Sequence, residues 1–125
     1  MDLHSCELSS KSGVSIGKWF GKLTKVEDLE VNLSWNKEFK DEGVKNAVQG
    51  IPTHNNLKRH YLDFCMCSLS SKSGVSIGKM FRKLTKVDDL EVNLSINEEF
   101  KDEGVKNFVQ EIPAHNNFKR LYLNF

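Results

Sequence analysis

Hydrophobic residues in this chain follow two alternating spacings. Leu29, Val31 and Leu33 are separated by polar residues, and this period of two predicts a β-strand with one buried face. The pattern then changes to the spacing of one helical face, which is carried by Val44, Ala47, Val48 and Ile51. We expect Asp41 to cap the N-terminus of this helix and Pro52 to end it.

The same change from strand to helix occurs again farther along the chain. Leu62, Phe64 and Met66 alternate with polar residues. The segment 73–84 then carries a second helical face, formed by Ile77, Met80 or Phe81, and Leu84. Matching the two strands gives a step of 31 residues, and the step to the next strand is 30. The hydrophobic pattern therefore predicts a strand and helix unit that repeats.

A longer repeat contains these units. Residues 2–64 recur as residues 63–125 at a constant offset of 61, and roughly three quarters of the positions are identical. Repetition at a fixed period is typical of solenoids, in which each unit packs against its neighbours. We therefore expect a single domain over residues 1–125, built from the duplicated blocks 2–63 and 63–125 and containing about four strand and helix units.

One position just after each expected strand alternates between two residue types, as Cys6, Asn36, Cys67 and Asn97. The strings Leu29-x-Val31-x-Leu33-x-x-Asn36 and Leu62-x-Phe64-x-x-Cys67-x-Leu69 surround this position. With this alternation the chain resembles leucine-rich repeat proteins of the ribonuclease-inhibitor-like class. The resemblance implies an α/β solenoid, a horseshoe segment with a parallel β-sheet on the concave side and α-helices on the convex side. His60 departs from it, because leucine is usual there, as at Leu121 in the second block.

The alternating position has a structural explanation. An asparagine side chain at this turn can bond neighbouring backbone groups, and a small cysteine can pack there. We therefore expect the asparagines to hold successive turns together. Cys6 and Cys67 are expected to lie in the core.

Composition narrows the classes of function. The chain has 18 Lys and Arg residues against 17 Asp and Glu residues, and its net charge of +1 provides no large basic surface for phosphates. We therefore expect no nucleic-acid partner. The N-terminal residues do not resemble a secretion signal, and no apolar run is long enough to cross a bilayer. We expect no membrane partner and a cytoplasmic location, in which the three cysteines are reduced.

Glycines near the start of each block invite comparison with a phosphate-binding loop. They occur in Gly13-Val-Ser-Ile-Gly17-Lys18 and in its copy over residues 74–79. The glycines are one residue too close, and Trp19 or Met80 occupies the position of the magnesium-binding hydroxyl. We expect these glycines to allow close packing of helices instead.

Cysteine and histidine residues provide two further candidates for chemistry. Zinc-binding residue types occur together in two places, at Cys65 and Cys67 with His60 and at Cys6 with His4. Neither set has the paired spacing of a structural zinc site. His54 and His115 have no nucleophile or acid at a suitable spacing and fit a polar loop better. We therefore expect no catalytic residue, no cofactor and no metal, and hence a chain that is not an enzyme.

A solenoid of this kind binds partners along the concave face of its sheet. The alternation predicts that the following side chains point outward there: Glu30, Asn32, Ser34, Tyr61, Asp63, Cys65, Glu91, Asn93, Ser95, Tyr122 and Asn124. We expect Tyr61 and Tyr122 to anchor a partner. The carboxylates on this face would select a partner with basic groups. The same pattern also fits an ordinary solvated strand surface, and Trp35 fits either a rim contact or packing.

These features favour a non-enzymatic module that binds a protein partner through its concave β-sheet. The resemblance implies two alternatives, which are a regulatory segment of a larger, kinase-associated signalling protein and an enzyme regulator of the ribonuclease-inhibitor or GTPase-activating type. Solenoid ends require a polar outer face, and neither end of the chain carries a polar capping unit. We therefore also expect either a fragment of a longer repeat protein or end-to-end self-association through uncapped repeats.

Overall fold

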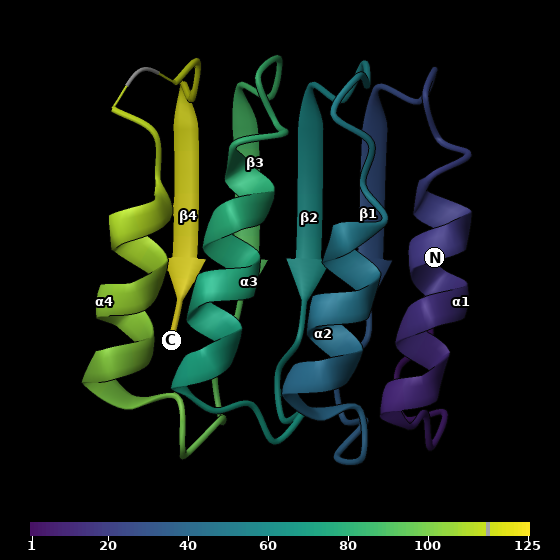
Figure 1. Cartoon of the computed structure of the whole chain (residues 1–125), viewed down its shortest axis with the longest axis vertical. Helices are drawn as coiled ribbons and strands as arrows, with labels where there is room; N and C mark the ends of the chain where they lie inside the picture. The colour runs from purple at the N-terminus through teal and green to yellow at the C-terminus, as the bar shows by residue number, and fades with distance from the viewer. Residues whose placement is uncertain (115) are drawn as a thin grey trace.

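The computed structural model describes residues 1–114 and 116–125. Helices and strands alternate along the chain in the following order: α1 (Ser10–Phe20), β1 (Asp28–Asn32), α2 (Lys40–Gln49), β2 (Arg59–Asp63), α3 (Ser71–Phe81), β3 (Asp89–Asn93), α4 (Lys101–Glu111) and β4 (Arg120–Asn124). Figure 1 shows the four helices side by side on one face of the sheet. In the described part of the chain, no helix has the length and apolarity needed to cross a bilayer.

All four strands are parallel and follow the order β1, β2, β3, β4 across one sheet. The register places Val31 beside Leu62 and Leu62 beside Val92, which are the pairs that the steps of 31 and 30 predict. These findings confirm the expected α/β class and the solenoid-like repetition of strand and helix units. Two strands are shorter than the pattern suggests. Strand β1 ends at Asn32, one residue before Leu33, and β2 ends at Asp63, so that Met66 lies in the following turn with a φ of 53°.

The hydrophobic core fills the space between the sheet and the helices. Val31, Leu62 and Val92 are fully buried under the helical layer. Burial of this apolar surface is the main favourable contribution to folding. No helix of residues 1–114 and 116–125 packs on the opposite face of the sheet, which we call the open face.

Asparagine side chains join neighbouring turns in the way that the sequence predicts. Asn97 accepts hydrogen bonds from the backbone amides of Cys67 and Leu69 through Oδ1, both at 3.0 Å. Its Nδ2 donates to the backbone carbonyls of Phe64 and Leu94, at 2.9 and 2.8 Å. Asn36 makes the same four contacts one block earlier. Each asparagine therefore satisfies backbone groups of two successive units.

The two cysteines at this position differ in environment. Cys67 is fully buried, and its thiol lies 3.1 Å from the backbone carbonyl of Leu33, as the sequence predicts. Burial raises the pKa of this thiol to about 12, which keeps it protonated. The prediction for Cys6 is wrong, because this residue is exposed. Cys6 lies in the first turn of the described stack, where no preceding unit covers it.

Asp41 does not cap α2, contrary to the sequence-based expectation. The helix starts at Lys40, two residues earlier than a cap at Asp41 implies, with Phe39 at the N-cap position and no side-chain capping bond. The Asp41 carboxylate instead accepts hydrogen bonds from the backbone amide of Ser70, at 2.9 Å, and from the hydroxyls of Ser70 and Ser73. A carboxylate at this place joins the start of α2 to the start of α3 and also favours both helix N-termini electrostatically.

Glycines bring the helices of each block together, which confirms the packing role expected for them. A Cβ atom on Gly13 would overlap the backbone of Gly43, and a Cβ atom on Gly74 would overlap the carbonyl oxygen of Gly104. These contacts join α1 to α2 and α3 to α4. A larger residue would therefore push the paired helices apart.

His60 is a buried polar residue in the apolar core. Its side chain faces the helices, in the row formed by Leu29, Leu90 and Leu121, and only 2% of its surface is exposed. Neither ring nitrogen has a hydrogen-bond partner among the described residues. Burial lowers the pKa of this imidazole to about 4, so the ring is neutral at physiological pH.

Replacing His60 by leucine should stabilise the protein. At pH 7 we expect His60→Leu to raise the free energy of unfolding by about 1–3 kcal/mol, because two unsatisfied polar atoms leave the core. The wild type should also lose stability as the pH falls from 6.5 to 4, since only the unfolded histidine binds a proton in that range. The variant should lack this loss, which amounts to about 3 kcal/mol.

Urea unfolding at several pH values measures both effects on His60. The exposed His54 provides the control, because His54→Leu removes no buried polar atom and should leave the stability at pH 7 unchanged. A His60→Leu variant less stable than the wild type at pH 7, or with an unchanged pH dependence, would contradict the proposed environment.

The glycine contacts make a second prediction. Gly74→Ala should destabilise the protein by about 1–3 kcal/mol, because the new methyl group overlaps the Gly104 backbone. Gly21→Ala is the matched control, since the nearest atom to its Cβ would be 3.5 Å away and its φ of −58° suits alanine. Thermal unfolding followed by circular dichroism compares the two, and equal melting temperatures would contradict close packing at Gly74.

Candidate functional site

The parallel register arranges the side chains of the open face in rows that run across the strands. Equivalent residues of successive strands lie beside one another because the strands pair without a shift. The three rows are Asp28, Arg59, Asp89 and Arg120; then Glu30, Tyr61, Glu91 and Tyr122; then Asn32, Asp63, Asn93 and Asn124. The open face is therefore polar and carries two tyrosines in one row.

Most of the side chains predicted for this face are accessible. Glu30 and Tyr122 are exposed, and the half-buried residues are Asn32, Tyr61, Asp63, Glu91, Asn93, Ser95 and Asn124. Ser34 and Cys65 depart from the prediction, because only 5% and 9% of their surfaces are exposed. Both follow the ends of their strands, in turns that hydrogen-bond to one another: the Trp35 amide donates to the Cys65 carbonyl at 2.8 Å. Neighbouring turns therefore cover these two side chains.

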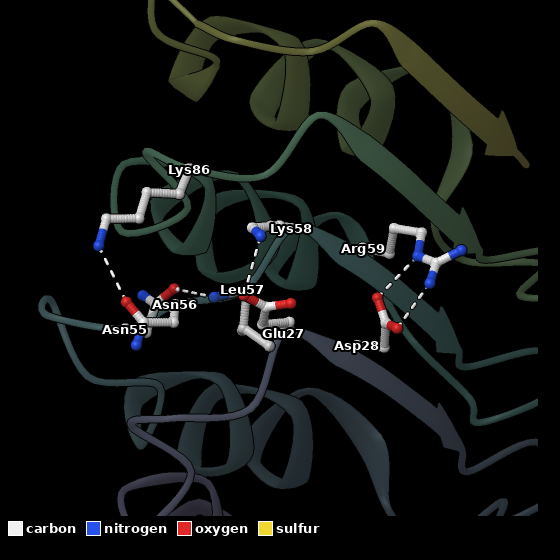
Figure 2. Close-up of polar contacts among 8 residues, drawn as sticks. All are labelled: Glu27, Asp28, Asn55, Asn56, Leu57, Lys58, Arg59 and Lys86. Atoms are coloured by element: carbon white, nitrogen blue, oxygen red, sulfur yellow. Dashed lines mark hydrogen bonds and ion pairs between the residues drawn. The ribbon is translucent and has the colours of Figure 1, made fainter.

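Sequence reasoning missed the row of alternating charge at the start of the strands. Arg59 donates two hydrogen bonds to the Asp28 carboxylate, at 2.7 and 2.6 Å, as Figure 2 shows. The Arg59 hydrogen bond lowers the pKa of Asp28. Arg120 makes the equivalent contact with Asp89 at 2.7 Å. The sequence could have predicted this row, because the alternation that places Glu30 on the open face also places residue 28 there.

A second set of contacts orders the chain just before β2. The Lys58 ammonium lies 2.8 Å from the Glu27 carboxylate, and Lys86 donates to the Asn56 side chain at 2.9 Å (Figure 2). Asn55 accepts a hydrogen bond from the Leu57 amide at 3.1 Å. The Lys58–Glu27 and Lys86–Asn56 contacts join successive units at the end of the strands where the charged row lies, whereas the Leu57–Asn55 bond is local. Exposed ion pairs contribute little to stability, so their main effect here is to orient the charged side chains.

The first two rows border a shallow groove of about 510 Å³ on the open face. Five carboxylates and two guanidinium groups point from the three rows, which gives the face a net formal charge of −3: Asp28, Glu30, Asp63, Asp89 and Glu91 against Arg59 and Arg120. Both arginines are already paired with aspartates. The groove is therefore suited to a ligand that supplies positive charge.

Tyr61 lies at the centre of this surface. Its hydroxyl donates to the Asp63 carboxylate at 3.0 Å. Burial, this hydrogen bond and the charges of Asp63, Glu91 and Glu30, in that order of importance, raise the pKa of Tyr61 to about 12. The phenol therefore stays neutral, and its ring provides apolar surface among carboxylates.

Large apolar side chains border the open face at the other end of the strands. Trp35 and Ile96 occupy equivalent turn positions, and about half of each side chain is exposed. Both have positive φ angles, 64° and 57°, a conformation that bulky residues rarely adopt. Trp35 contacts the His4 ring edge to face, with centroids 6.2 Å apart. Trp35 thus lies at the rim, and an exposed apolar pair of this kind suits contact with another macromolecule.

One serine and histidine pair occurs near this rim. The Ser34 hydroxyl lies 2.9 Å from His4 Nδ1 and donates to Asn32 Oδ1 at 2.6 Å. With its single proton given to Asn32, the hydroxyl can only accept from His4, so the imidazole is not placed to act as its base. The pair therefore serves to hold the first turn against the second.

The other candidate chemical groups lie apart from the open face. Cys67 and His60 are buried on the helical side, and His54 is exposed in a loop. His115 is outside the described residues. Across residues 1–114 and 116–125, no group of three or more His, Cys, Asp or Glu side chains could hold a metal ion. Searches against protein-family models and curated proteins found no match to this chain.

The environment of Tyr61 can be measured by spectrophotometric titration. We expect one of the two tyrosines, Tyr61, to ionise with a midpoint near 12, because its carboxylate neighbours and its partial burial oppose a phenolate. Tyr61→Phe should remove that component, and Tyr122→Phe, as the control variant, should leave it in place. A Tyr61 midpoint near 10, the ordinary value of tyrosine, would contradict the acidic environment.

Proposed function

We propose that this chain is a leucine-rich repeat segment of the ribonuclease-inhibitor-like class that binds a basic protein partner across the open face of its sheet. The resemblance to this class is supported by Asn36 and Asn97, which bond successive turns, and by the buried Cys67 between them. The parallel sheet with a helical layer on one face agrees with it. The three cysteines form no disulfide, which supports a cytoplasmic setting.

The observation that carries the binding proposal is the composition of the row with two tyrosines. Tyr61 and Tyr122 alternate with Glu30 and Glu91 along one line across the sheet. Tyrosine offers a rigid apolar ring at a small entropic cost, and it is enriched among residues that dominate binding energy. The adjacent carboxylates would pair with lysine or arginine side chains of the partner.

The apolar rim extends this surface. Trp35 and Ile96 lie beyond the polar rows, so a partner that covers the rows would also bury part of these side chains. An extended or helical segment with basic residues toward the groove and an apolar residue toward the rim fits this arrangement. A purely acidic partner would meet the net negative charge of the face and be repelled.

The two alternatives, a regulatory segment of a kinase-associated protein and a regulator of the ribonuclease-inhibitor or GTPase-activating type, rest on the resemblance alone. Both would still use the sheet for contact. We therefore treat the partner as a protein and define it by its charge.

Binding should depend on the two tyrosines. A partner isolated by crosslinking to the wild-type chain should bind the Tyr61→Ala, Tyr122→Ala variant at least about tenfold more weakly, a loss of about 1.4 kcal/mol or more. Isothermal titration calorimetry with the purified partner measures the dissociation constants. The matched control is the double variant Glu42→Ala, Glu103→Ala. It also changes one pair of equivalent residues in the two blocks, but these lie on the exposed side of the helices.

Charge provides a second measurement on the same complex. Glu30→Lys with Glu91→Lys should weaken binding, and the salt dependence of the wild-type affinity should decrease in this variant. An unchanged affinity in the tyrosine variant, or an affinity for the wild type that rises with salt, would contradict the proposal.

A further inference from the structure

The residues that join the two blocks have identical copies at the two ends of the stack. At the junction, Asp41 of α2 accepts hydrogen bonds from Ser70 and Ser73 of the next block. The same residues occur one block away, as Asp102 at the start of α4 and as Ser9 and Ser12 at the start of α1. Within residues 1–114 and 116–125, no hydrogen bond or ion pair reaches the Asp102 carboxylate, and the Ser9 hydroxyl makes no capping bond.

Residues of the first block that are buried at the junction have identical counterparts in the second block that are exposed. Val48 is 3% exposed beneath α3, whereas its counterpart Val109 on α4 is 53% exposed. Phe64 is fully buried, whereas its counterpart Phe125 is 46% exposed. The last layer therefore presents apolar residues that the first block buries against the second.

The opposite end of the stack shows the complementary difference. Cys67 and Ser73 are fully buried at the junction. Their counterparts, Cys6 and Ser12, are exposed and half-buried respectively. The surface at the end of the stack therefore matches one side of the junction between the blocks, and the surface at its start matches the other side.

A groove at the last layer lies where a first-turn segment would pack if the contact of the junction were repeated there. It measures about 290 Å³, and its lining includes Leu94, Asn97, Phe100, Val105 and Phe125. Inside the chain, the Cys67 thiol lies against the carbonyl of Leu33, the counterpart of Leu94. The segment around Cys6 in a second copy is therefore the natural occupant of the groove.

The sheet can continue through the same contact. The outer edge of β1 is paired only with residues 1–3, through Leu3 N to Asn32 O at 2.8 Å and Asn32 N to Met1 O at 3.0 Å. Residues 1–3 and 123–125 stand at equivalent positions, two block lengths apart. A second copy's β4 would therefore take the place of residues 1–3 and extend the pairing along the whole of β1.

We propose that the chain assembles head to tail, with α4 and β4 of one copy docked on α1 and β1 of the next. Strand β4 displaces residues 1–3, in the register that β2 shows with β3, so that Arg120 faces Asp28 and Asn124 faces Asn32. Asp102 accepts hydrogen bonds from Ser9 and Ser12, and the Cys6 segment fills the groove. Because this contact joins two different surfaces, it is repeated at each new copy and gives head-to-tail chains or rings rather than two-fold dimers.

Sedimentation velocity across a wide range of concentration tests this assembly with the 125-residue chain. The wild type should form species that grow beyond the dimer, and Asp102→Lys should weaken the association by about tenfold or more. Glu103→Lys is the control, because it makes the same change of charge one residue away on α4. Adding Ser12→Asp to Asp102→Lys should restore association, since it supplies a carboxylate opposite the new ammonium group.

Cys6 gives a second, local measurement. Its thiol is exposed in a single copy and should become buried at the junction, as Cys67 is. Maleimide labelling of Cys6 should therefore slow as the wild-type concentration rises, and it should stay fast in Asp102→Lys. A chain that remains monomeric with constant Cys6 labelling would overturn the proposal, and so would a dimer that Asp102→Lys leaves unchanged.

Discussion

The structure depends on pairing the backbone groups in the turns that follow the strands. A turn between a strand and a helix leaves amides and carbonyls that no ladder satisfies, and burial makes this costly. Asn36 and Asn97 supply those partners, each bonding two successive turns. Asn36 joins the first turn to the second, and Asn97 joins the third to the fourth. The second and third turns are joined by the Cys67 thiol on the Leu33 carbonyl and by the Trp35 amide on the Cys65 carbonyl. Successive units are therefore fixed to one another at the turns, and the parallel strands keep their register. The rows of the open face, and hence the proposed binding surface, exist only through that register.

Much of this arrangement was visible in the sequence. The period of two identified the strands and their faces, and the duplication gave the step that aligns Glu30 with Tyr61 and Glu91. The charged row of Arg59 and Asp28 could have been found by extending the same alternation. Local patterns failed where distant units decide the environment. Asp41 resembles a helix cap within its own segment, yet its partners are the amide and hydroxyl groups of a helix 29 residues later.

Comparison of the two blocks separates the effect of sequence from that of surroundings. Val48 and Val109 stand in the same local sequence, and so do Phe64 and Phe125, but only the first of each pair has a following unit packed on it. His60 and Leu121 differ in residue type, although they occupy equivalent positions on β2 and β4. Position in the stack therefore determines burial as strongly as residue type does.

The helical layer is less uniform than the sheet beneath it. Glycines bring α1 against α2 and α3 against α4, whereas a groove of about 120 Å³, bordered by Val48, Ser76 and Met80, lies between α2 and α3. The carboxylate of Asp41 on α2 adds polar contacts to Ser70 and Ser73 at the start of α3. The strands, by contrast, pair continuously from one block to the next. Because glycine-mediated contacts hold the helices together within each block but not between the blocks, we expect the curvature of the open face to change most easily at the pairing of β2 with β3.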